Sequence, residues 1–79
     1  MRWIYKLIEK SGRFYIYAYA RESEVLDGVI SYDTKNSKIT VAKPCSKDIG
    51  KKYGVEKAIE HFQHVIDEGF PEERHVDCG

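Results

Sequence analysis

The stretch from Arg13 to Ala20 alternates strictly between two kinds of side chain, and this alternation constrains the fold more than any other feature. One side of an extended chain would receive Phe14, Ile16, Ala18 and Ala20, and the other Tyr15, Tyr17 and Tyr19. Because side chains alternate across a strand and aromatic residues favour strands, the pattern predicts a β-strand with two usable faces. A small domain needs one apolar face for its own core, so the second, aromatic face predicts a contact with a partner.

Length and composition limit what the chain can be. Its 79 residues predict one domain over 1–79, and a domain of this size buries only roughly 60–65% of its unfolded surface, which favours oligomerisation as added stability. Thirteen basic and thirteen acidic residues cancel, although residues 34–54 carry a net charge of +5. Two cysteines make no disulfide framework, and no apolar run reaches the ~20 residues of a membrane span. We therefore expect a cytoplasmic protein with reduced thiols and no membrane contact.

The first half of the chain predicts four strands. Residues 3–9 form the first, and a two-residue loop at Ser11-Gly12 would set Lys10 opposite Arg13. In that register Trp3, Tyr5 and Leu7 join the Phe14 side, which we take as the core face. Residues 29–32 and 38–43 follow as strands joined by a turn at residues 33–36, a register that would pair Tyr32 with Lys38 and Ile30 with Thr40.

The second half predicts one helix. Apolar residues recur at helical spacing from Val55 to Ile66, Gly69 suits the position after a helix end, and Pro71 prevents continuation. We place the helix within 46–69 and leave open whether Gly50 or Gly54 interrupts it. The tail, 70–79, can add an edge strand at residues 75–76. The predicted fold class is α+β: a four-stranded antiparallel β-meander over 1–43 with one C-terminal helix on the Phe14 and Ile16 face, the strand order being undetermined.

One helix covers only one face of such a sheet, so the tyrosine face needs another explanation. We predict a non-enzymatic interaction module in which this face forms a homodimer or docks a protein partner. On this assignment, Tyr17→Glu breaks the contact and leaves the sheet folded. The predicted interface residues are Ile4, Ile8, Tyr15, Tyr17, Tyr19, Ile30 and Tyr32.

Two other interpretations of the tyrosine face remain open. It could stack the bases of single-stranded nucleic acid while Lys6, Lys35 and Lys38 hold phosphates. Zero net charge and the isoleucines on this face disfavour that alternative. The third interpretation is a solvated outer face whose tyrosines lie beside long lysine side chains.

Metal binding and catalysis have weaker signals. The right residue types occur in His61-x-x-His64 and His75-x-x-Cys78, but on a helical wheel His61 and His64 point to solvent, so we predict no metal site and no other cofactor. Cys45 follows a proline at a possible helix start, a setting that can lower a thiol pKa. No neighbouring residue supplies a base, so we predict a partly buried free thiol and no catalytic residue.

Two segments carry a resemblance. Leu26-Asp27-Gly28-Val29-Ile30-Ser31-Tyr32-Asp33 and Glu68-Gly69-Phe70-Pro71-Glu72-Glu73-Arg74 resemble the "LDG-x-I-x-YD" hairpin and "GFP-x-x-R" end of a group of short bacterial proteins with no assigned function. That resemblance implies a bacterial source and no site. Strands followed by a helix are also similar to the arm-type DNA-binding domains of integrases, which read DNA with a three-stranded sheet and are usually basic. No motif of that family is found in this neutral chain.

Overall fold

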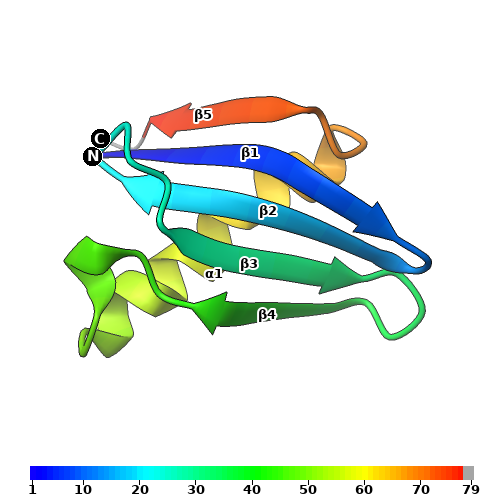
Figure 1. The fold of residues 1–79 in the computed structure, drawn as a ribbon, viewed down its shortest axis with the longest axis horizontal. Coiled ribbons are helices and arrows are strands. Elements are labelled where there is room, and N and C mark those ends of the chain that lie inside the picture. The colour runs from blue at the N-terminus through cyan, green and yellow to red at the C-terminus, as the bar shows by residue number, and fades with distance from the viewer. Residues whose placement is uncertain (78–79) are drawn as a thin grey trace.

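A computed structural model describes residues 1–77 as a five-stranded antiparallel sheet with one α-helix behind it (Figure 1). The strand order is β4-β3-β2-β1-β5, so the long strands β1 and β2 lie inside the sheet. No helix within 1–77 is long and apolar enough to cross a membrane. The elements are β1 (Arg2–Ser11), β2 (Phe14–Arg21), β3 (Gly28–Asp33), β4 (Lys38–Lys43), a 3₁₀ turn η1 (Ser46–Asp48), α1 (Lys52–Asp67) and β5 (Glu73–Asp77).

The fifth strand corrects the predicted strand count. The antiparallel meander of β1 to β4 is confirmed, but the C-terminal segment returns as β5 and pairs with β1, with Val76 opposite Trp3. The edge strand that residues 75–76 suggested is therefore real and longer, and the prediction of four strands is wrong. Only Val76 of β5 is buried, so apolar patterning alone indicates little of its length.

A β-bulge in β1 decides which face of the sheet each side chain occupies. Near the turn Lys10 pairs with Tyr15 and Glu9 with Ile16, but the register then shifts at Ile8, so that Leu7 pairs with Tyr17. One extra residue exchanges the two faces of the strand beyond it. As a result, Trp3, Tyr5 and Leu7 lie on the tyrosine side of the sheet and not beside Phe14 and Ile16, as the simple register predicted.

The helix packs on the tyrosine face, which overturns the predicted layering. Tyr5, Tyr17 and Tyr19 are completely buried, and the ring centroids of Tyr5 and Tyr17 both lie 5.3 Å from that of Phe62 on α1. The bulge explains the choice, because it gathers the large aromatic side chains of β1 and β2 on one side, and covering that side removes the most apolar surface from water. The buried core consists of Trp3, Tyr5, Tyr17, Tyr19, Ala20, Ile30, Cys45, Ala58, Phe62, Val65 and Val76.

The β3–β4 hairpin is one residue out of its predicted register. Ile30 pairs with Val41 and Tyr32 with Ile39, so the apolar residues of β4 join the covered face instead of the opposite one. The turn explains the shift: the Asp33 carboxylate accepts a hydrogen bond from the Lys35 N–H (2.9 Å), and the left-handed residue is Ser37 (φ 52°). The loop thus has four residues between paired ends.

The predicted helix over 46–69 divides at its first glycine. Gly50 takes a left-handed φ of 74° between η1 and α1, whereas Gly54 lies inside the first turn of α1 and is buried. At the other end Gly69 has a φ of 78°, which confirms its predicted role after the helix. Phe70 then folds back, with its N–H donating to the Val65 carbonyl (3.0 Å) and its ring stacked 3.8 Å from Tyr15.

Candidate functional site

Two of the predicted interface tyrosines, Tyr17 and Tyr19, are structural, because their hydroxyl groups form hydrogen bonds within the chain. Tyr17 donates to the Pro71 carbonyl, and Tyr5, which was predicted to be a core residue, donates to the Ala58 carbonyl of α1, both at 2.6 Å. The Tyr19 oxygen accepts the Cys45 N–H at 3.1 Å. A buried tyrosine with a satisfied hydroxyl is a core residue, so the prediction that this face lies open for a partner is wrong.

The seven predicted interface residues separate across the sheet. The five from β2 and β3 (Tyr15, Tyr17, Tyr19, Ile30 and Tyr32) pack on the α1 side. Ile4 pairs with Ala20 on the opposite side and is nearly buried there, while Ile8 is exposed at the bulge. Three lysines were predicted to hold phosphates in the nucleic-acid alternative. Lys6 and Lys38 lie on the other side of the sheet from the tyrosines, and Lys35 lies in the β3–β4 turn. A nucleic-acid strand therefore cannot stack on the tyrosines while Lys6 or Lys38 holds its phosphates.

Burial of the phenols gives the fold an expected sensitivity to alkaline pH. It raises the pKa of Tyr5 and the pKa values of Tyr17 and Tyr19, the latter two from 10.0 to about 12. The folded state holds these protons more tightly than the unfolded state, so their stabilisation is complete below pH 10 and is lost as the pH rises toward 12. We expect circular dichroism to show unfolding in this interval, together with the rise in tyrosinate absorbance. A chain that stays folded after all six tyrosines have ionised would contradict this.

The opposite side of the sheet, here called the uncovered face, has no helix or strand of residues 1–77 packed against it (Figure 1). Its centre on β2 and β3 is apolar: Phe14 is 37% exposed, and Ile16, Ala18 and Val29 are half-buried. Beside the start of β1 the connection from β2 to β3 crosses this side (Figure 1), and Ile4 and Ala20 there are buried. The exposed apolar area is thus concentrated away from that end.

Charged side chains flank this apolar centre in an ordered way. The pairing of all five strands places one row across the uncovered face: Lys43, Val29, Ala18, Lys6 and Glu73. The β4 edge carries the exposed Lys38 and Lys43, and the β5 edge carries the exposed Glu73 and Asp77. The two outer edges of the face therefore have opposite charge.

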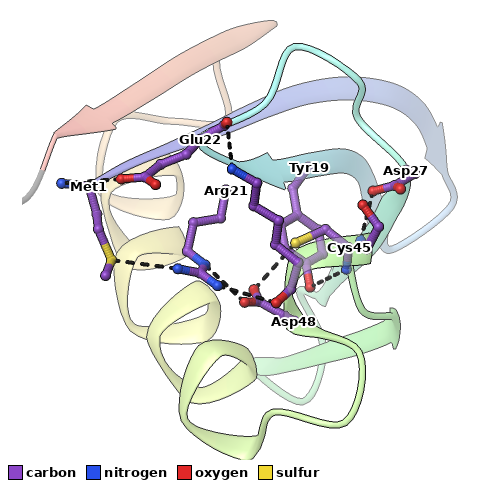
Figure 2. A network of polar contacts seen from close by, with 9 residues as sticks. Met1, Tyr19, Arg21, Glu22, Asp27, Cys45 and Asp48 are labelled. Atoms are coloured by element: carbon purple, nitrogen blue, oxygen red, sulfur yellow. Dashed lines mark hydrogen bonds and ion pairs between the residues drawn. The ribbon is translucent and has the colours of Figure 1, made fainter.

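A buried polar network ties β2 to the start of α1 (Figure 2). Asp48 is fully buried; one carboxylate oxygen accepts from Arg21 Nε (2.9 Å) and the other from the Cys45 thiol (3.3 Å). Arg21 also donates to the Lys47 carbonyl (3.2 Å). A Cβ on Gly54 would overlap the Asp48 carboxylate, which explains a glycine inside the first helical turn. The network joins β2 to η1 and the first turn of α1, with 27 positions between Arg21 and Asp48.

The same network gives the Cys45 thiol a structural role. Burial, and then the hydrogen bond to Asp48, raise the pKa of this thiol, which opposes formation of the nucleophilic thiolate. Cys45 is 1% exposed, so it is more deeply buried than predicted.

A cavity of about 290 Å³ opens beside this network, between the ends of β1 and β2 and the first turn of α1. Carbon dominates its lining, through the Trp3 indole, the Tyr53 ring and the alkyl parts of longer side chains. Four cationic residues contribute to the wall, and no acidic residue of the described chain does. The lining residues are Met1, Trp3, Arg21, Lys51, Lys52, Tyr53, Gly54 and Lys57. The sequence did not reveal this cavity, because its residues come from three separate segments.

The histidines do not assemble a metal centre in the described part of the chain. His61 is buried against Trp3, with 4.4 Å between ring centroids, so the prediction that it faces solvent is wrong, whereas His64 is exposed as predicted. Burial lowers the pKa of His61. Within residues 1–77 no three histidine, cysteine or acidic side chains group closely enough to hold a metal ion. Cys78, the partner proposed for His75, lies outside the described residues.

Comparisons of the chain with models of protein families, with curated protein sequences and with solved structures found no match. A functional assignment must therefore come from the uncovered face and the cavity themselves.

Proposed function

We propose that the protein is a small, non-enzymatic interaction module of the cytoplasm whose uncovered sheet face binds a second copy of the chain. The observation that carries this proposal is an apolar centre on β2 and β3 with no element of residues 1–77 packed over it. Two such faces can stack at about 10 Å, as in a β-sandwich, and each then covers the other's Phe14 and Ile16.

The charge pattern favours a second copy over an unrelated partner. A two-fold axis running along β2 between the two sheets places the β4 edge of one chain over the β5 edge of the other. In the row through Ala18, Lys43 of one copy then faces the partner's Glu73 at each side of the stack. A face with oppositely charged outer edges is complementary to itself under this rotation.

The size of the face indicates a weak dimer. The whole molecule extends 29 × 22 Å along its two longer axes, a projection of about 640 Å², which is below the ~800 Å² per partner of a typical stable interface. We therefore expect the dimer to dissociate on dilution in the micromolar range, which makes its affinity easy to measure.

Charge reversal at the two edges tests this arrangement. Both Lys43 and Glu73 are exposed, so Lys43→Glu and Glu73→Lys should leave the fold intact. Each single change sets like charges opposite one another, and we expect it to weaken dimerisation about tenfold, whereas the double change should restore it to within about threefold. The readout is the dimer dissociation constant from sedimentation equilibrium.

Lys52→Glu is the matched control, since it makes the same charge change on α1, away from the uncovered face. It should leave the dissociation constant unchanged. Single changes without effect, or a double change that does not restore dimerisation, would reject the proposed two-fold arrangement.

A further inference from the structure

We propose that the cavity at the start of α1 binds a small organic monoanion, one carboxylate joined to an apolar body about the size of a benzene ring. The cavity lies on the α1 side of the sheet, so this proposal is independent of the dimer through the uncovered face.

The lining accounts for the apolar body. A volume of about 290 Å³ is at the lower end for ligand pockets, where a single ring with a short chain fits. Trp3 is 2% exposed, whereas Tyr53 is 69% exposed and can close over a ligand. The ammonium of Lys57 lies 5.5 Å from the Tyr53 ring centre, which holds that ring beside the basic wall.

The charges account for the carboxylate. α1 begins at the cavity without a side-chain cap and without an acidic residue of its own first turn, and the buried Asp48 carboxylate beside Gly54 offsets part of the positive end of the helix dipole. The lysine pair Lys51 and Lys52 stands at this same end. An anion placed among these groups gains chiefly from the two lysines.

The neighbouring acids limit the ligand to a single charge. Arg21 is paired with the buried Asp48, Lys57 lies 3.0 Å from Glu60, and Lys52 lies 3.9 Å from Glu56. Four cations against three acids leave an excess of one positive charge, which matches a monocarboxylate and not a polyphosphate. A carbon-rich lining also offers few partners for the hydrogen-bonding edge of a nucleobase.

The single tryptophan of the chain lies in this cavity, so its fluorescence reports occupancy directly. We would titrate the protein with 3-phenylpropionate and with 3-phenylpropanamide, which has the same shape and no charge. We expect the carboxylate to bind at least tenfold more tightly than the amide, and added salt to reduce that preference. Amide resonances of residues 51–54 should shift with the same dissociation constant.

Variants test separately the recognition of the carboxylate and the recognition of the apolar body. Lys51→Gln with Lys52→Gln should lower the acid-to-amide preference to about threefold or less, and Tyr53→Ala should weaken both probes equally. These positions are exposed, so the variants should fold. The matched control, Lys10→Gln with Lys35→Gln near the distant hairpin turns, should bind like the parent chain. Equal affinity for acid and amide, or no response to either at about 10 mM, would overturn the proposal.

Discussion

Glutamate in place of Tyr17 is expected to unfold the protein. Tyr17 is completely buried between β2 and α1, and its hydroxyl donates to the Pro71 carbonyl at 2.6 Å. The substitution removes an aromatic ring from the Phe62 contact and places a carboxylate in a completely buried position, so we expect a loss above ~4 kcal/mol, a large part of the stability of a domain this small. Circular dichroism and urea titration measure it.

Ile16→Glu is the matched control, because it introduces the same side chain one residue away on the opposite face. Ile16 is half-buried on the uncovered face, so this variant should stay folded and lose only dimerisation. The alternation by itself predicted the reverse, with Tyr17→Glu folded. A folded Tyr17→Glu protein beside an unfolded Ile16→Glu protein would show that α1 covers the other side of the sheet.

Alanine in place of Asp48 should cost about 3–5 kcal/mol, since it breaks a buried ion pair and leaves Arg21 without its partner. The change also removes the acceptor of the hydrogen bond from the Cys45 thiol. Because Asp48 has no exposed surface, its truncation leaves a cavity as well. Thermal unfolding followed by circular dichroism measures the effect. As a comparison, Glu56→Ala breaks the solvent-exposed ion pair between Lys52 and Glu56 on α1. It should change the free energy of unfolding by less than ~0.5 kcal/mol.

Gly54 provides a test of the same geometry through a double-mutant cycle. Gly54→Ala alone should destabilise the protein, although alanine favours a helix, because its Cβ overlaps the Asp48 carboxylate. In the Asp48→Ala background the carboxylate is gone and only the approach to the Cβ of residue 48 (3.2 Å) remains, so the same change should be much less destabilising. Additive effects of the two substitutions would contradict the contact.

The alternation of β2 and the spacing of Val55 to Ile66 were enough to predict an antiparallel sheet with one helix. The C-terminal end of α1 could also be predicted from its own residues, because Gly69 takes the left-handed conformation and Pro71 cannot continue a helix. These features depend on neighbouring residues, which is why they can be read from the chain.

The assignment of the two faces could not be predicted in this way. It depends on a bulge at Ile8, and a bulge leaves no mark in an alternating pattern while it exchanges the faces beyond it. One signal was available: only the shifted register gathers Tyr5 with Tyr17 and Tyr19, the largest apolar group in the sheet. Weighing the total aromatic area on each face would have favoured that register.

The polar network and the cavity depend on tertiary contacts. Arg21 and Asp48 are 27 positions apart, and nothing near either residue indicates the other. Gly54 inside a helical pattern was a partial signal, since such a glycine often marks a close approach. The helical wheel predicted that His61 faces solvent because it takes account only of residues within the helix. The burial of His61 comes from Trp3, which lies on β1.

The solution mass over a dilution series, by size-exclusion chromatography with light scattering, tests the central claim most directly. A second copy on the uncovered face predicts a mass near twice 9.2 kDa at high concentration, falling toward 9.2 kDa on dilution, and a constant 9.2 kDa for Ile16→Glu. A parent chain that remains at 9.2 kDa at every concentration would contradict the dimer.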